Sequence, residues 1–144
     1  MVHIPAPVPG LVIRYAYLWT DEYDAGRDEG VKDRPAAVVL AQRDNGGKLI
    51  VVVVPVTHSP PTVAADALEI PQGTKRRLGL DDDRSWIVLT ETNVFAWPGP
   101  DLRPLADEGT IAYGLLPANL FRELRSRLTA KIAAGQLRRI PRSE

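Results

Sequence analysis

An arginine and a threonine stand at the open end of a predicted β-hairpin, where their side chains could share one ligand. Arg34 precedes the apolar run Ala36–Ala41, and Thr57 ends the apolar run Lys48–Thr57. If the chain turns at Asn45–Gly46, a strong hairpin signal, Arg34 and Thr57 are equally far from the turn and lie opposite each other. A guanidinium beside a hydroxyl suits an oxyanion such as a phosphodiester. The alternative is that Arg34 pairs with loop carboxylates and Thr57 only ends a strand.

His58 follows Thr57 directly, and histidine is the side chain best suited to move protons near neutral pH. In a straight strand, position 58 points to the opposite face from position 57, whereas Pro60–Pro61 offers a bend that brings it back. His58 is therefore either a general base beside Thr57 or a loop histidine. The chain has no cysteine, and its two histidines are far apart in sequence. We therefore expect no metal site, and we interpret Asp81–Asp83 as a solvated turn.

Three tryptophans offer flat surfaces on which the bases of single-stranded RNA could stack. Trp97 lies beside Pro98–Pro100 at the end of a strand and is the one expected to be exposed. Trp86 lies in an apolar run and is expected in the core or in a dimer interface. Trp19 ends the first predicted strand.

The length and charge of the chain limit the classes of function. It has 144 residues, of which 18 are Lys or Arg and 18 are Asp or Glu. We expect a single domain over residues 1–144 with about 1–9 and 139–144 mobile, and only local contact with nucleic acid. From Arg122 to Glu144, seven basic residues face two acidic ones, which suits RNA phosphates, an acidic partner or simply a solvated helix face. No secretion signal or membrane span is evident, so we expect a cytoplasmic protein with no membrane contact.

The pattern of elements predicts a mostly β fold with one long C-terminal helix. Glycine- and proline-rich turns separate five or six short apolar runs, and residues 20–33 and 71–83 are expected to be loops. After Pro117, leucines recur every four residues up to Ile132, and Gly135 ends the pattern. We expect a small, partly open β-barrel with the helix against one mouth or flank. The predicted strands cover residues 11–19, 36–41, 48–57, 67–70, 85–90 (continuing to 97 past a bend) and 110–116.

Three segments, in order, resemble the PemK/MazF toxins of toxin–antitoxin pairs. Lys32–Leu40 has the Arg-Pro that opens an apolar strand in that family, and Val53–Thr57 reads Val-Val-Pro-Val-Thr, similar to the motif that closes the next strand. Leu89–Trp97 resembles a later strand in which an acidic residue precedes a turn back into the sheet. The resemblance covers about residues 8–134.

This resemblance implies an SH3-like barrel that forms a homodimer and acts as a growth-inhibitory endoribonuclease, in some cases serving plasmid maintenance. It implies metal-independent and cofactor-independent cleavage of single-stranded RNA, leaving a 2′,3′-cyclic phosphate and a 5′-hydroxyl. Arg34 and Thr57 match the catalytic positions of the family. Glu91 joins His58 as a candidate general base, and its stretch adds two RNA contacts, Asn93 and Trp97. A cognate acidic antitoxin is the expected protein partner.

Two other functions fit a small barrel of this kind. One is a non-catalytic CcdB-like growth inhibitor that binds a protein target such as gyrase, and the other is an inactive SH3-like binding module. Three features depart from the commoner family pattern: the acidic segment 20–33, the long segment 60–83, and the turn 97–100. The acidic segment would repel RNA beside Arg34 unless it folds away. Cleavage specificity therefore cannot be carried over from the family.

Overall fold

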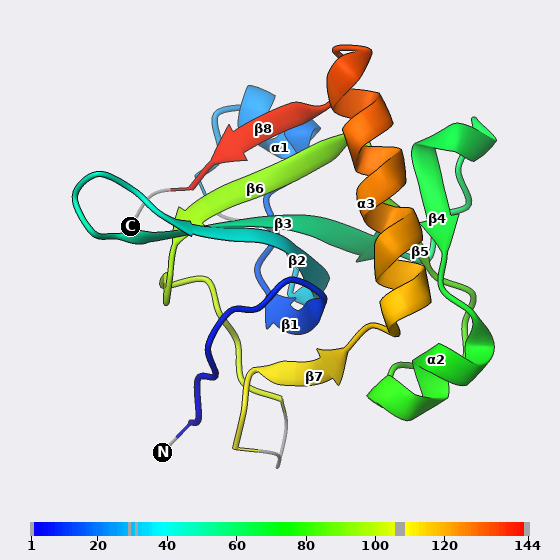
Figure 1. Cartoon of the computed structure of the whole chain (residues 1–144), viewed down its shortest axis with the longest axis horizontal. Coiled ribbons are helices and arrows are strands. Elements are labelled where there is room, and N and C mark those ends of the chain that lie inside the picture. Colours follow the sequence, from blue (N-terminus) through cyan, green and yellow to red (C-terminus); the bar gives the residue numbers. More distant parts are fainter. Residues whose placement is uncertain (1, 29, 31, 106–108, 143–144) are drawn as a thin grey trace.

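The structure, a computed structural model, describes residues 2–28, 30, 32–105 and 109–142. Within these residues eight strands are accompanied by three α-helices and one 3₁₀ helix (Figure 1). No helix in this part of the chain has the length and apolar character needed to span a membrane. The elements are β1 (Leu11–Tyr15), α1 (Thr20–Asp24), β2 (Arg34–Arg43), β3 (Leu49–Thr57), η1 (Ala64–Asp66), β4 (Ala67–Glu69), α2 (Gln72–Leu78), β5 (Trp86–Val88), β6 (Glu91–Ala96), β7 (Ala112–Leu115), α3 (Ala118–Ala133) and β8 (Arg138–Pro141).

The strands form an open, mostly antiparallel sheet centred on β3. Its order is β4-β5-β3-β2-β1-β7, and β6 pairs with both β3 and β8. One edge of β3 pairs with β2, whereas the other edge pairs first with β6, over Ile50–Val53, and then with β5, over Val56–Thr57. Pro55, which lacks an N–H, lies between the two partners. The pair β6–β8 is parallel.

Apolar side chains of the central strands alternate between two cores, one on each face of the sheet. On one face, Val12 of β1 and Val54 of β3 pack with α2 and α3 residues such as Leu124. On the other face, Ile13 and Val53 pack with aromatic residues and β6. Because successive strand residues point to opposite faces, both faces of β3 are buried, as the valine run Val51–Val54 predicts.

Helix α3 packs against the end of the sheet near β4 and β5 (Figure 1). Leu120, Leu124 and Leu128 are buried, so this part of the four-residue pattern is confirmed. Ile132, the next in the series, is 62% exposed because the helix ends at Ala133, beyond the edge of the core. The expected C-terminal helix is thus present, with its last apolar position in solvent.

Two predicted loops contain short helices. Residues 20–33 include α1, whose first turn carries Asp21 and Glu22, where acidic side chains favour a helix N-terminus. Residues 71–83 include α2, whose last turn is basic and which ends at Gly79 with a φ of 71°. The predicted strand 85–97 is two strands, β5 and β6. The number of strands is eight rather than five or six, and the sheet is open.

Described residues near both ends of the chain, within the segments expected to be mobile, have backbone or core partners. The backbone N–H of His3 donates to the carbonyl of Gly109. Residues 138–141 form β8, in which Ile140 is fully buried, and Arg142 lies in the core. The polar composition of residues 138–142 gave no indication that Ile140 and Arg142 are buried. Residues 1, 143 and 144, also expected to be mobile, lie outside the described residues.

Candidate active site

The β2–β3 hairpin places Arg34 and Thr57 together at its open end. The observed pairs Ala36–Pro55 and Val38–Val53 follow the predicted register, which puts position 34 opposite position 57. The route differs from the prediction, because the turn is centred on Gly46, half a residue later, and a bulge at Val39 restores the register. The predicted juxtaposition at the base of the hairpin is therefore confirmed.

Arg34 is half-buried, yet much of its hydrogen-bonding capacity is unused. One Nη donates to the carbonyl of Val56 at 3.5 Å, and the buried Nε has no hydrogen-bond partner among the described residues. The guanidinium stacks on the Trp19 ring, 4.8 Å from its centroid. Burial lowers the pKa of Arg34, and the nearby Glu22 acts in the opposite direction. A desolvated cation with a free donor is favourable for an incoming oxyanion.

A groove runs past Arg34 and Thr57. We define this Arg34–Thr57 groove as two adjoining hollows that both residues line. The narrower hollow, of about 230 Å³, also contacts His58 and Asp81. The wider one, of about 470 Å³, is bounded by Trp19 and the start of α1. The hydroxyl oxygen of Thr57 accepts a hydrogen bond from the N–H of Ser59 at 3.2 Å, and its O–H remains available as a donor.

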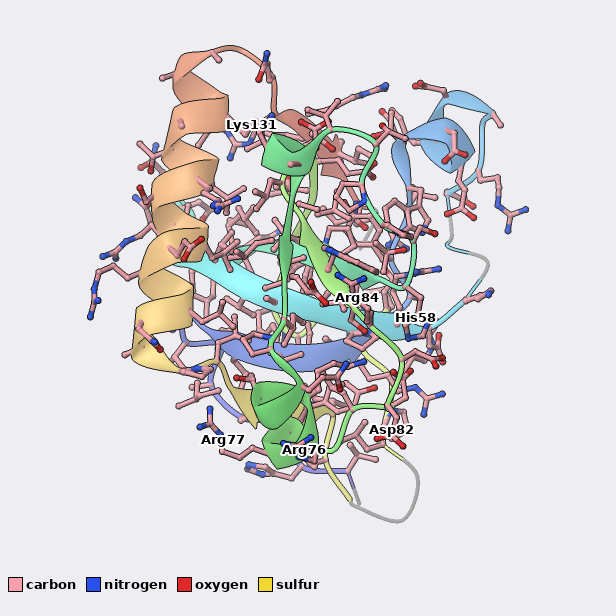
Figure 2. The ribbon with its side chains drawn as sticks, turned by 90° about the vertical axis from the view of Figure 1, so that its right-hand side faces the viewer. His58, Arg76, Arg77, Asp82, Arg84 and Lys131 are labelled. Carbon is pink, nitrogen blue, oxygen red and sulfur yellow. The ribbon has the colours of Figure 1, made fainter. Side chains whose placement is uncertain are left out.

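His58 lies in the narrower hollow next to Thr57, so the chain bends as Pro60–Pro61 allowed. Its Nε2 lies 2.7 Å from Oδ2 of Asp81, and the other oxygen of Asp81 accepts from Lys75 at 2.7 Å. His58 and Asp81 are exposed, whereas Lys75 is buried with 1% of its side chain accessible. Figure 2 shows His58 and Asp82 on the surface of the face that carries β4 and α2. Asp81 is therefore part of an ion-paired network rather than a simple solvated turn.

His58, Asp81 and Asp83 have potential ligand atoms within 4.8 Å of one another. The ammonium group of Lys75 binds at the same place, to the Asp81 carboxylate and to the carbonyl of Asp83. A cation from the chain itself thus neutralises this cluster, which gives no reason to add a metal ion to the site.

Trp19 forms the aromatic wall of the groove, a role that the sequence assigned to Trp97. The segment 18–20 is fixed by β6 and α1, because Asn93 bonds both backbone groups of Leu18 at 2.8 Å. The N–H of Trp19 donates to Glu22 at 3.0 Å, and that of Thr20 donates to Glu91 at 3.0 Å. Three consecutive residues are thus held by polar side chains from elsewhere.

Glu91 and Asn93, the predicted base and RNA contact, bind the backbone on either side of Trp19. Asn93 is fully buried, and its amide is occupied by Leu18 and Arg142, so the structure places it in a supporting position rather than on the groove surface. Glu91 is half-buried, accepts from Tyr17 and Thr20, and lines neither hollow of the groove. Burial raises its pKa, which those hydrogen bonds oppose. A pattern of motif residues could not separate these supporting side chains from those that line the groove.

Trp97 lies far from the groove. Its N–H donates to the carbonyl of Leu49, at the opposite end of β3 from Thr57, and nine strand residues span roughly 25 Å. The ring packs against Phe95 and the second core, so the structure gives Trp97 no place beside Arg34. Trp86 is buried, in agreement with one of its two expected locations.

Two carboxylates of the acidic segment before β2 are paired with arginines from other parts of the chain. Asp33 lies within 3.6 Å of both Arg14 and Arg103, and Asp24 pairs with Arg138 at 2.8 Å. Glu22 is engaged by the N–H of Trp19. Repulsion of an anion at Arg34 is thereby reduced, although the wider hollow keeps an acidic rim at α1.

Comparison with known proteins assigns the chain to no family. A scan against protein-family models gives no match to the chain. A search of curated proteins likewise gives no match. The arrangement of Arg34, Thr57 and His58 around one groove must therefore be interpreted from its own chemistry.

Proposed function

We propose that the protein is a growth-inhibitory endoribonuclease of the PemK/MazF type that cleaves single-stranded RNA without a metal ion. The observation that carries this proposal is the groove that a half-buried arginine and a threonine both line. The fold also supports it, because an SH3-like barrel needs a strand that passes between two partners, as β3 does between β6 and β5.

The chemistry follows from where negative charge accumulates. Attack of a ribose 2′-hydroxyl on the adjacent phosphorus gives a pentacoordinate phosphorane whose non-bridging oxygens carry more charge than those of the diester. The guanidinium of Arg34 would bind these oxygens more tightly in the transition state than in the substrate. Thr57 would donate its hydroxyl to the same phosphate and orient it. The products are a 2′,3′-cyclic phosphate and a 5′-hydroxyl.

The wider hollow suits the neighbouring base. Trp19 lies there within stacking distance of Arg34, and stacking on aromatic rings is the main way that proteins hold single-stranded RNA. In this proposal Trp19, not Trp97, stacks with a base beside the scissile phosphate.

The proposal includes a homodimer and an acidic antitoxin as protein partners. Arg122 and Arg125, exposed cations on α3, support an acidic partner. Light scattering of the purified protein tests the dimer independently of cleavage.

The deciding experiment is incubation of the purified protein with a long single-stranded RNA in EDTA. We expect fragments with 5′-hydroxyl and cyclic phosphate ends from the wild type, and at least about 100-fold slower cleavage by Arg34→Ala and Thr57→Val. Arg77→Ala, which removes an exposed cation from α2, is the matched control and should cleave normally.

Two results would contradict the proposal. Equal cleavage by the wild type and Arg34→Ala would place the activity elsewhere or in a contaminant. No cleavage of several RNAs by the wild type would favour a CcdB-like inhibitor or a binding module instead.

A further inference from the structure

The Arg34–Thr57 groove contains one feature that the proposed roles of arginine and threonine do not use. A chain of three ionisable side chains leads from the interior to the narrower hollow: the Lys75 ammonium, the Asp81 carboxylate and the His58 imidazole, joined by two contacts of 2.7 Å. The inner end is buried and the outer end is exposed. A lysine is rarely buried unless it is paired, so the burial of Lys75 depends on its ion pair with Asp81.

Local structure holds this chain in place. Helix α2 ends at Gly79, where the chain reverses, and the N–H of Leu80 donates back to the carbonyl of Lys75 at 2.9 Å. Asp81 therefore returns over the helix turn that carries Lys75. The Asp81 carboxylate also accepts from the N–H of Asp83 at 3.2 Å. The hydrogen bonds from Lys75 and His58 hold the pKa of Asp81 below its usual range, so it is an anion at neutral pH.

An anion at this position determines which histidine nitrogen is free. A carboxylate only accepts hydrogen bonds, so the 2.7 Å contact requires a proton on Nε2 of His58. In the neutral ring, Nδ1 is then the unprotonated nitrogen. A carboxylate that orients a histidine and fixes its tautomer is the second half of many general-base pairs.

We propose that Lys75 and Asp81 position His58 so that Nδ1 of its imidazole accepts the proton of the attacking 2′-hydroxyl. This inference rests on the proposed function and adds to it the base and its two positioning residues. Glu91, the other candidate base, is engaged behind the groove wall and lines neither hollow.

The step balances with water as the only other participant. The 2′-hydroxyl gives its proton to Nδ1 of His58, the 2′-oxygen forms a bond to phosphorus, and the bond from phosphorus to the 5′-oxygen breaks. The leaving 5′-oxygen takes a proton from water, and the hydroxide so formed accepts the proton of the imidazolium. Asp81 stabilises the imidazolium between these events and keeps its own charge.

Several charged groups surround His58 and set the pH range of this step. Its ionisable neighbours come from the segment before β2, from β2 itself, from α2 and from the loop after α2. These groups are Lys32, Asp33, Arg34, Lys75, Asp81 and Asp83. Asp81 is the anion in direct contact with the ring, so its substitution is the most direct test of the positioning role.

The test measures the pH dependence of RNA cleavage in EDTA for four proteins. We expect His58→Ala to lower kcat by about 10²–10⁴-fold and Asp81→Asn to lower it about tenfold or more with an unchanged KM. At every pH measured, a fall in kcat with KM unchanged distinguishes a role in the proton transfer from a role in RNA binding. Asp82→Asn, an exposed neighbour of the same type, should match the wild type.

Proton NMR of the histidine ring signals provides a readout that needs no RNA. The chain has two histidines, so His3 serves as an internal reference for His58. In the wild type the neutral His58 ring should carry its proton on Nε2, and Asp81→Asn and Lys75→Met should both show a mixture of the two tautomers, while the His3 signals should not change. Asp81→Asn also keeps the inference testable if Lys75→Met does not fold.

The outcomes separate the two proposals. If the wild type cleaves RNA and Asp81→Asn has the same kcat and the same His58 tautomer, the positioning role is overturned and the proposed function stands. If the wild type cleaves no RNA, both are overturned.

Discussion

Arg34 is half-buried and Arg142 is almost completely buried, and the two guanidinium groups have different surroundings. Arg142 has 1% of its side chain exposed and pairs with Asp101 at 2.9 Å. It also donates to the carbonyl of Ala16 at 2.7 Å and to Asn93 at 3.1 Å. Arg34, half-buried, has one long hydrogen bond to Val56, a buried Nε without a partner, and a groove in front of it.

The difference shows how to recognise an arginine that serves a ligand. A guanidinium that stabilises the fold is surrounded by acceptors from the chain, because an uncompensated buried charge is strongly destabilising. Arg34 is partly desolvated, but the described residues offer it few acceptors. Both guanidinium groups have a buried Nε with no hydrogen-bond partner among the described residues, so that feature does not separate them. Arg142 has the carboxylate of Asp101 at 2.9 Å and is closed off from solvent, whereas Arg34 lines an open groove, which is why Arg34 and not Arg142 carries the proposed function.

The largest effect should come from the structural arginine. Arg142→Met should lower the free energy of unfolding by about 3–5 kcal/mol, because it removes the cation that faces buried Asp101. Arg34→Met should change stability by less than about 1 kcal/mol. Urea denaturation of both variants measures this contrast. Equal losses of stability would mean that Arg34 also serves the fold.

A slightly smaller effect, on the reaction rather than on stability, should come from the groove arginine. Arg34→Lys keeps the charge but loses the planar fork that contacts two phosphate oxygens. We expect a fall in kcat of about 10²–10³-fold, which is the usual cost of losing one transition-state donor, at unchanged stability. Single-turnover cleavage of RNA by the variant and the wild type measures it. Full activity of the lysine variant would show that a point charge is sufficient.

The smallest effect should distinguish the two tryptophans. Trp19→Leu should weaken RNA binding by about 1–3 kcal/mol, the range for one stacked base, and should raise KM more than it lowers kcat. Trp97→Leu should leave KM unchanged, because Trp97 lies at the far end of β3. Fluorescence titration with a non-cleavable RNA compares the two. A larger effect of Trp97→Leu would reverse this assignment of the binding surface.

The central hairpin could be predicted from the sequence because its signals are local. A valine run and a glycine-containing turn define β2 and β3, and the register at their base follows by counting residues from the turn. The helix α3 was equally clear from its leucine spacing. Arg34, Thr57 and His58 could be brought to one groove for the same reason.

The remaining site residues depend on contacts between distant parts of the chain. Trp19 reaches the groove because Asn93, 75 positions later, binds Leu18, and no local pattern predicts that pair. The parallel pairing of β6 with β8 is also a long-range event. Lys75 and Asp81 looked like ordinary surface residues in the sequence, and only the chain reversal at Gly79 brings them together.

The position of β3 has a consequence for how the site can be controlled. Both of its edges are hydrogen-bonded, to β2 on one side and to β6 and then β5 on the other. Backbone amides in such a strand exchange with solvent water mainly when the whole domain unfolds. Thr57 ends this strand and Arg34 begins its neighbour, two residues beyond the last ladder pair, Ala36–Pro55. The floor of the site is therefore anchored to the part of the sheet that we expect to open last, so an inhibitor that fills the groove would meet a preformed surface.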